Sequence, residues 1–268
     1  MKMQLKKIPT TSGSTAKSLV FLPGGPGLSS ATLSSLMILS RSFNLYFVDS
    51  VQTESYTDDV SYEGLFSSTA ELLEEIKDEY ILCGHSFGGI LATDLIVTKA
   101  AQAKGLICIA SPFSSESFSA VNSQYGFHKT PELEAAETEF LTFPSNKTFQ
   151  NWLASYGRLY FKEENIEAGA KMLRNDKSSF EIFLSARDGA SFNADLLPMI
   201  KTLDMSKLFI AGQSDELFPE SFAQRDAKHG GFKFHSIQGA GHFVAFDAPI
   251  DTAKVIESEF QKHTGETT

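Results

Sequence analysis

The chain has 268 residues, of which 42% are hydrophobic and 21% are charged, and its formal net charge at pH 7 is -10. These values are ordinary for a globular protein and exclude a disordered or fibrous one. The acidic balance argues against nucleic acid or an anionic membrane as a partner, because both are bound by clustered Lys and Arg side chains. The length suits one large domain with an inserted subdomain rather than two full domains.

Local composition narrows the class further. Cys83 and Cys108 both lie in apolar, strand-like runs, which predicts reduced, buried thiols and excludes a disulfide framework. The amino-terminal segment lacks the continuous apolar stretch of a secretory signal. No apolar run approaches the ~18 to 20 residues that span a bilayer. We therefore expect a cytoplasmic protein that does not enter a membrane.

Strand-like and helix-like segments alternate from the start of the chain to residue 112. Apolar runs that predict strands cover residues 3–8, 18–22, 45–48, 80–83 and 105–110. Helical patterns separate the later runs, at residues 29–40, 68–77 and 88–100. Such alternation at short spacing is typical of the α/β class, with a mostly parallel central sheet and helices on both faces.

Residues 113–203 have a different character, because strand-like runs vanish and segments rich in aromatic and acidic residues replace them. The helices predicted there cover residues 131–141, 147–159, 165–173 and 180–186. We interpret this block as a helical cap over the carboxyl edge of the sheet. The alternation then resumes, with strands at residues 207–211 and 232–237 and helices at residues 220–228 and 249–262. The predicted α/β core is therefore residues 1–112 and 204–268, and the cap is residues 113–203.

A sharp turn joins the strand at residues 80–83 to the helix that follows it. The turn reads Gly84-His85-Ser86-Phe87-Gly88, which fits the Gly-x-Ser-x-Gly pattern of a nucleophile elbow. Glycines flank the serine because a turn this tight leaves no room for side chains. Ser86 is therefore predicted to stand exposed at the carboxyl end of its strand, as a catalytic nucleophile.

A serine hydroxyl needs an imidazole to take its proton and a carboxylate to orient that imidazole. Asp215 directly follows the strand at residues 207–211, and His242 follows the strand at residues 232–237. Both are thus expected at the same sheet edge as Ser86, in the chain order serine, acid, histidine. Glu216 is the alternative acid. The competing histidines are His85, His128, His229 and His235.

Two backbone N–H groups are expected to stabilise the oxyanion that forms when a serine attacks a carbonyl. One is the amide of Phe87, the residue after the nucleophile. The other is assigned to Gly25, in the loop Pro23-Gly24-Gly25-Pro26-Gly27, whose glycines allow close backbone approach. Asp247 is expected to start the last helix, where its charge suits the helix dipole.

Other chemical signatures do not occur in the sequence. It has no GxxxxGK[ST] phosphate loop, no GxGxxG between a strand and a helix, and no CxxC or HExxH metal spacing. No cofactor and no metal site is therefore expected, and the expected partner is a small-molecule or short-peptide substrate.

These motifs resemble the α/β-hydrolase superfamily, and the resemblance extends along nearly the whole chain. Within it the chain is similar to the proline iminopeptidase group of serine aminopeptidases, which carry a His-Gly-Gly-Pro-Gly loop, a Gly-x-Ser-x-Gly-Gly elbow and a helical cap. Pro23 replaces the leading histidine of that loop. The resemblance implies an α/β-hydrolase fold, Ser86, Asp215 and His242 as a catalytic triad, and Gly25 and Phe87 as oxyanion donors.

The substrate has to be argued from the cap. An aminopeptidase holds a protonated amine, which buried carboxylates bind by charge-assisted hydrogen bonds, although helix carboxylates more often form a solvated face. The candidates are Glu134, Glu137, Glu139, Glu163 and Glu164. The cap aromatics Phe140, Phe143, Phe149, Trp152, Tyr156, Tyr160 and Phe161 fall near helical spacing and are more often core than substrate wall. We select Glu137, Trp152 and Tyr156 as predicted substrate-binding residues.

Three hypotheses follow for the function. The first is a serine hydrolase that works through an acyl-enzyme, most specifically an aminopeptidase releasing an amino-terminal proline or similar small residue. The second is a carboxylesterase, thioesterase or lactonase of the same architecture, favoured if the cap glutamates face solvent. The third is a non-catalytic binding module, which would have no physical need for a complete Ser/Asp/His set.

Overall fold

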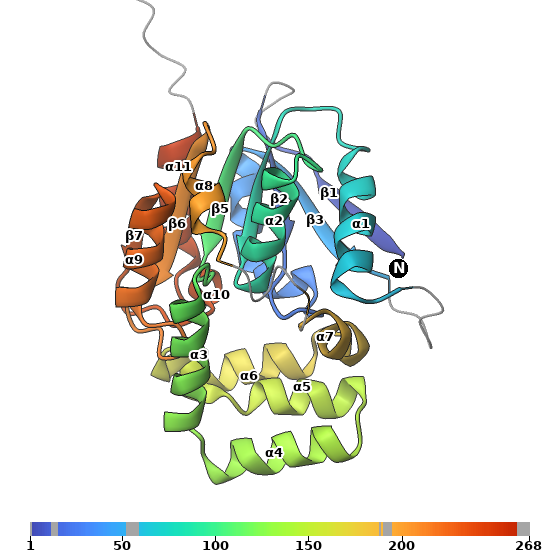
Figure 1. Ribbon diagram of the computed structural model, residues 1–268, viewed down its shortest axis with the longest axis vertical. Coiled ribbons are helices and arrows are strands. Elements are labelled where there is room, and N and C mark those ends of the chain that lie inside the picture. Colours follow the sequence, from blue (N-terminus) through green and yellow to red (C-terminus); the bar gives the residue numbers. More distant parts are fainter. Residues whose placement is uncertain (1, 12–15, 52–58, 188, 190–194, 262–268) are drawn as a thin grey trace, which may run out of the picture.

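The computed structural model describes residues 2–11, 16–51, 59–187, 189 and 195–261. Residue 262, the predicted end of the last helix, lies outside this part of the chain. A seven-stranded sheet forms the centre, in the order β1-β3-β2-β4-β5-β6-β7 (Figure 1). The strands are β1 (Met3–Ile8), β2 (Ser18–Leu22), β3 (Asn44–Ser50), β4 (Tyr80–His85), β5 (Gly105–Ile109), β6 (Ser206–Gly212) and β7 (Lys233–Ile237).

The sheet is parallel except at one edge, where β1 pairs antiparallel with β3. Every residue of β2, β4 and β5 is buried, as expected for central parallel strands covered on both faces. Their continuous apolar runs are the reason that the sequence predicted them so closely. The α/β class and the mostly parallel sheet are confirmed.

Helices cover both faces of the sheet and enclose two separate cores. One core packs under α1 (Tyr62–Leu73), α2 (Phe87–Val97), α8 (Leu197–Lys201) and α9 (Glu220–Gly230). The other packs under the 3-10 helix η1 (Ser30–Arg41), α10 (Val244–Asp247) and α11 (Pro249–Phe260). Cys83 and Cys108 are free and buried, one in each core, so the sheet separates the two thiols.

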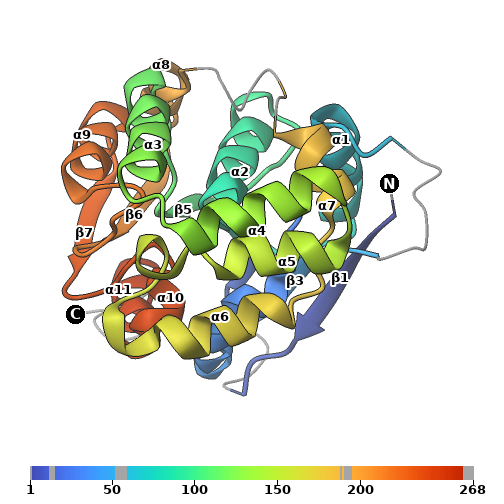
Figure 2. The same cartoon turned by 90° about the horizontal axis from the view of Figure 1, so that it is seen from below.

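The cap lies across the carboxyl ends of the strands. Its elements are α3 (Ser115–Phe127), α4 (Pro131–Thr142), α5 (Asn146–Ala154), the short helices η2 (Gly157–Leu159) and η3 (Glu163–Asn165), α6 (Ile166–Arg174) and α7 (Phe180–Ala186). Figure 2 shows α4, α5 and α6 side by side over the sheet end. A third core, rich in aromatic rings, holds them together. Because α8 packs against α2 and α9, the boundaries 113–203 stay a proposal for the extent of the cap.

Two predicted helices differ clearly from the structure, and a third helix, α3, was missed. α1 begins at Tyr62, capped by the Ser61 hydroxyl, and not at residue 68. The helix predicted over residues 147–159 ends at Ala154, because the chain turns at Gly157 with φ 51°. α3 was not predicted at all, since its serine-rich sequence buries only Ser117 and Ala120 and so lacks a clear apolar stripe.

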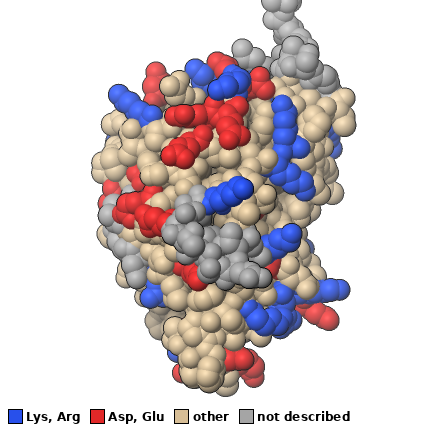
Figure 3. Space-filling view, turned by 90° about the vertical axis from the view of Figure 1, so that its right-hand side faces the viewer, with Lys and Arg blue, Asp and Glu red and all other residues tan. Residues whose placement is uncertain are grey.

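The surface carries charged side chains of both signs. On the face of β1 and α1 drawn in Figure 3, acidic and basic side chains are intermingled among uncharged ones. In the described ranges, no helix combines the length and apolar character needed to cross a membrane.

Candidate active site

The elbow places Ser86 in a conformation that non-glycine residues rarely adopt, with φ 50° and ψ -119°. Close backbone contact enforces this turn. A Cβ atom added to Gly84 would lie 2.2 Å from the carbonyl of Gly88, and one added to Gly88 would lie 2.2 Å from the Leu22 carbonyl oxygen. Both flanking glycines are therefore sterically required, and the turn leaves Ser86 half-buried at the end of β4.

Asp215 and His242 meet at the carboxyl edge of the sheet, beyond β6 and β7. The His242 Nδ1 atom lies 2.9 Å from the Asp215 Oδ2 atom, and both side chains are buried. The Asp215 Oδ1 atom accepts hydrogen bonds from the backbone N–H groups of Leu217 and Phe218, at 2.9 and 2.8 Å. With Oδ1 satisfied by two donors, Oδ2 is left to accept from the imidazole, which fixes the Nδ1–H tautomer of His242.

Ser86 and His242 line one cavity, so the structure brings the three predicted triad residues to a single site. Within the described part of the chain, the hydrogen bonds do not include one between the Ser86 hydroxyl and His242. Such bonds are often long before substrate binds. Glu216, the alternative acid, instead faces His128 and Arg158 near the surface.

The two predicted oxyanion donors border the same cavity. Phe87 is the first residue of α2, and the N–H groups of a first helical turn point out of the helix N-terminus. Gly25 has φ 114°, and a Cβ atom there would lie 2.8 Å from the Gly27 nitrogen. A side chain is thus excluded at Gly25 by the backbone of its own loop. The loop approaches the elbow at Gly24, where an added Cβ atom would lie 2.9 Å from the His85 Nδ1 atom.

His85 has a structural role that the sequence did not reveal. Burial, aided by the neighbouring His242, lowers the pKa of its imidazole to about 3, so the ring is neutral at physiological pH. Its Nε2 atom lies 3.0 Å from the His242 carbonyl oxygen, and we therefore assign Nε2 as the protonated nitrogen. The His85 side chain therefore supports the backbone of His242. The position of His85 next to Ser86 in the elbow was the sequence signal that could have indicated this role.

Two carboxylates fix the chain that follows the oxyanion loop. The Asp176 carboxylate accepts hydrogen bonds from the Ser29 backbone N–H, at 3.0 Å, and from the Ser29 hydroxyl. Asp49, at the end of β3, accepts from the backbone N–H and hydroxyl of Ser30. Burial is the main cause that raises the pKa of Asp176 to about 6, and the nearby Asp49 charge adds to it.

This raised pKa gives a pH-dependent contribution to stability. Between about pH 4 and 6 the unfolded Asp176 carboxyl has lost its proton while the folded one keeps it, so stability falls as pH rises through this window. Asp176→Asn keeps both hydrogen-bond positions without the charge. We expect it to exceed wild type in free energy of unfolding by about 2 kcal/mol near pH 8 and to match it near pH 4. Urea unfolding at both pH values measures this, with the exposed Asp251→Asn as control; a difference independent of pH would refute it.

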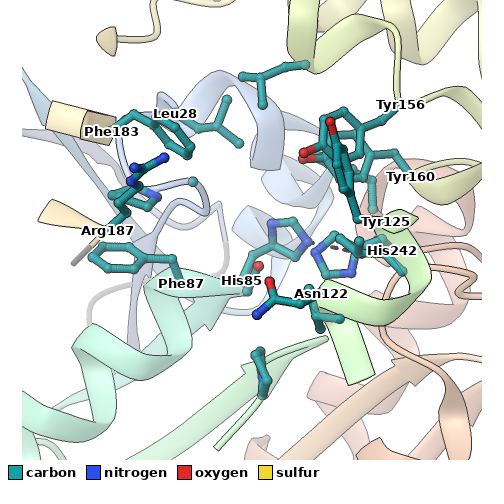
Figure 4. Close-up of a pocket in the computed structure, with 18 of the residues that line it drawn as sticks. Leu28, His85, Phe87, Asn122, Tyr125, Tyr156, Tyr160, Phe183, Arg187 and His242 are labelled. Carbon is teal, nitrogen blue, oxygen red and sulfur yellow. Dashed lines mark hydrogen bonds between the residues drawn. The ribbon is translucent and has the colours of Figure 1, made fainter. Parts of the chain in front are cut away.

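The cavity above Ser86 has a volume of about 450 Å³. Figure 4 shows Tyr125, Tyr156 and Tyr160 on one side and Phe183 and Arg187 on the other. The Tyr156 and Tyr160 rings stack at 4.3 Å, and Tyr160 stacks on the His242 ring at 5.8 Å. An aromatic wall therefore runs from the imidazole into the cap.

The predicted substrate residues Glu137, Trp152 and Tyr156 all line this cavity. The other four candidate glutamates, Glu134, Glu139, Glu163 and Glu164, are exposed. The Glu137 carboxylate lies 3.1 Å from the Lys129 ammonium. Glu137 falls four residues after the buried Leu133 and three before the buried Phe140, so helical spacing alone would have placed it on the inner face of α4.

Comparison with known proteins agrees with this architecture. A thermophilic esterase from Thermogutta terrifontis is 17% identical, with a TM-score of 0.72 over 96% of this chain and 92% of the esterase. MenH from S. aureus is 17% identical, with a TM-score of 0.71 over 95% and 96% of the two chains. Proline iminopeptidase from Mycobacterium smegmatis is 16% identical, with a TM-score of 0.69 over 96% and 93%. These identities are low, and the likeness shows the fold alone.

No curated protein sequence gives a significant match to the chain. The sequence profile of the alpha/beta hydrolase family, however, matches residues 19–255. The matched range runs from β2 to α11 and includes the elbow, the cap and both strand ends that carry Asp215 and His242. Because the profile covers the sheet and the cap together, the chain belongs to the alpha/beta hydrolase family.

Proposed function

We propose that the protein is a serine hydrolase in which Ser86 is the nucleophile, His242 the general base and Asp215 its orienting carboxylate. The observation that carries the proposal is the Asp215 carboxylate, held by two backbone N–H groups on one oxygen and paired with His242 at 2.9 Å on the other. This arrangement leaves the His242 Nε2 atom unprotonated and able to accept the Ser86 proton.

The reaction then follows from the geometry. Ser86 Oγ attacks the substrate carbonyl as His242 takes its proton, and the N–H groups of Gly25 and Phe87 stabilise the oxyanion. His242 returns the proton to the leaving group, which departs and leaves an acyl-Ser86 ester. A water molecule, deprotonated by His242, releases the acid and restores the hydroxyl. No cofactor takes part in these steps, and the cytoplasmic location predicted from sequence belongs to the same proposal.

For the substrate we propose a small acyl compound with a free amine, as in an amino-terminal residue of a short peptide. Glu137 supports this, because it is the candidate cap carboxylate that borders the cavity. Within the described residues, the buried Tyr125 hydroxyl interacts with Glu137 and Trp152, but neither it nor the Trp152 indole nitrogen forms a hydrogen bond of good geometry. Both residues line the cavity, and buried donors of this kind gain most from a polar substrate group.

A carboxylesterase, thioesterase or lactonase is the second candidate. One observation favours it: the Glu137 carboxylate already has a cationic partner in Lys129, at 3.1 Å. With that charge neutralised, the remaining wall is mostly aromatic and suits an uncharged acyl group. A non-catalytic binding module is less well supported, because the strained backbone of Ser86 has a use in catalysis and none in binding.

Glu137→Gln separates the two substrate classes. If Glu137 binds the amine, the variant is expected to lower kcat/KM on proline and alanine arylamides by about 10- to 100-fold, the value of a charge-assisted hydrogen bond. Short-chain acyl esters without an amine should be hydrolysed at the wild-type rate. Glu134→Gln is the matched control, since that carboxylate also faces Lys129 but is 63% exposed. An equal loss on both substrate classes, or ester turnover without any arylamide turnover, would contradict the aminopeptidase proposal.

A further inference from the structure

Asp247 has contacts that its predicted role does not explain. α11 begins at Pro249, and its N-cap is Ala248, so the expected place of Asp247 at the start of the last helix was wrong. The side chain is instead buried between the loop that carries His242 and the cap segment that follows Tyr160. It belongs to α10, next to the catalytic edge of the sheet.

The Asp247 carboxylate joins those two segments through three hydrogen bonds. Its Oδ2 atom accepts from the backbone N–H of Gly241 at 2.8 Å and from that of Lys162 at 2.9 Å. Its Oδ1 atom accepts from the Asn165 side-chain amide at 2.8 Å. One carboxylate thus binds the residue before His242 and two residues of the cap.

The residue after His242 is tied to the cap as well. The Phe243 N–H donates to the Tyr160 carbonyl oxygen at 3.0 Å. There is no room for a side chain at Gly241, because an added Cβ atom would lie 2.9 Å from the Tyr160 carbonyl oxygen and 3.1 Å from the Asp247 Oδ2 atom. His242 is therefore held between two anchored neighbours, while Tyr160 stacks on its ring.

We propose that Asp247 is a positioning residue for His242, which fixes the imidazole relative to Ser86 by locking the His242 loop to the cap. The inference rests on the proposed function of His242 as general base. Proton transfer depends steeply on geometry, and a displacement of about 1 Å costs about 100-fold in rate. A buried carboxylate that accepts two backbone N–H groups supplies that rigidity at the point where the loop leaves the sheet.

The test compares Asp247→Ala with Asp247→Asn. The alanine variant loses all three bonds and is expected to lower kcat by about 100-fold, with KM changed less than about 3-fold. In the asparagine variant the amide oxygen accepts the Gly241 and Lys162 N–H groups. Its NH₂ group donates to the Asn165 Oδ1 atom once the Asn165 side-chain amide has rotated by about 180°. Asp247→Asn should therefore keep kcat within about 5-fold of wild type, which a simple requirement for the charge would not allow.

Two further variants keep the test decisive if Asp247→Ala does not fold. Gly241→Ala pushes the loop away from Asp247 and Tyr160 and is expected to reproduce the loss in kcat. Asn165→Ala removes only a cap contact and should raise KM more than it lowers kcat. Asp251→Asn, on the exposed side of α11, is the control and should match wild type in both constants.

A spectroscopic readout separates this inference from the proposed function. The proton shared by His242 Nδ1 and Asp215 gives a far-downfield resonance in proton NMR, whose detection requires no substrate. The resonance should be present in wild type and in Asp247→Asn, and lost or broadened in folded Asp247→Ala or Gly241→Ala. Wild-type kcat in these two variants, or an unchanged resonance, would overturn the role of Asp247. Absence of any hydrolysis by wild type would instead reject the proposed function, and the resonance alone would then decide whether Asp247 fixes the His242 loop.

Discussion

Asp215→Asn is expected to lower kcat by about 10⁴-fold near neutral pH while leaving the fold intact. The reason lies in the two oxygens of the carboxylate. The Oδ1 atom accepts from the N–H groups of Leu217 and Phe218. Because only an acceptor fits there, the amide oxygen of asparagine must take the place of Oδ1. The NH₂ group is then turned toward His242 and donates to Nδ1. This forces the proton onto Nε2, and the imidazole no longer accepts a proton from Ser86.

Steady-state hydrolysis by wild type, Asp215→Asn and Glu216→Gln measures this effect. Glu216 is the matched control, because it is the adjacent carboxylate and its contacts are with Arg158 and His128. It should keep nearly full activity. Unfolding curves for the three proteins show whether the fold is retained. If Glu216→Gln were the inactive variant and Asp215→Asn the active one, the assignment of the acid would be wrong.

Ser86→Gly is expected to be inactive and at the same time more stable than wild type. The serine holds φ 50° and ψ -119°, a strained conformation that costs about 1–3 kcal/mol in a residue with a Cβ atom. Glycine adopts it freely but loses about 0.5–1 kcal/mol through the entropy of its unfolded state. The net expectation is a gain of about 1 kcal/mol in free energy of unfolding, together with a loss of at least about 10⁴-fold in kcat.

Ser86→Ala separates these two effects, since it removes the hydroxyl and keeps the strain. It should be as inactive as Ser86→Gly without the gain in stability. Lys99→Gly is the control for strain outside the site, because Lys99 also has a positive φ, of 61°; it should gain stability and keep full activity. Equal stability of the glycine and alanine variants at position 86 would show that the elbow stores no strain.

Local patterns in the sequence were sufficient to predict the central strands and the place of the catalytic triad. β2 and β4 are continuous apolar runs, and each predicted triad residue lies in the turn or loop that follows a strand. Parallel strands bring their carboxyl ends to one edge, so Ser86, Asp215 and His242 were predicted to meet without knowledge of any contact. The position of Glu137 was also available from the spacing of Leu133 and Phe140.

Contacts between segments far apart in the chain could not be predicted, because they produce no local pattern in the sequence. Asp176 binds Ser29 and Asp247 binds Lys162, pairs far apart in the chain, and no local rule relates their residues. Asp247 is the clearest case, because an acidic residue shortly before the last helix fits a helix start equally well. α3 was missed for a different reason. Its buried residues are few and polar or small, so the sequence shows no apolar repeat at helical spacing.

Covalent labelling with a fluorophosphonate tests the central claim, that Ser86 is an activated nucleophile, most directly. Intact-mass and peptide mass spectrometry of wild type should show one phosphonyl adduct, on Ser86. Ser86→Ala should show none, and Asp215→Asn should label far more slowly than wild type. A wild-type protein that stays unlabelled, or an adduct that persists in Ser86→Ala, would contradict the account.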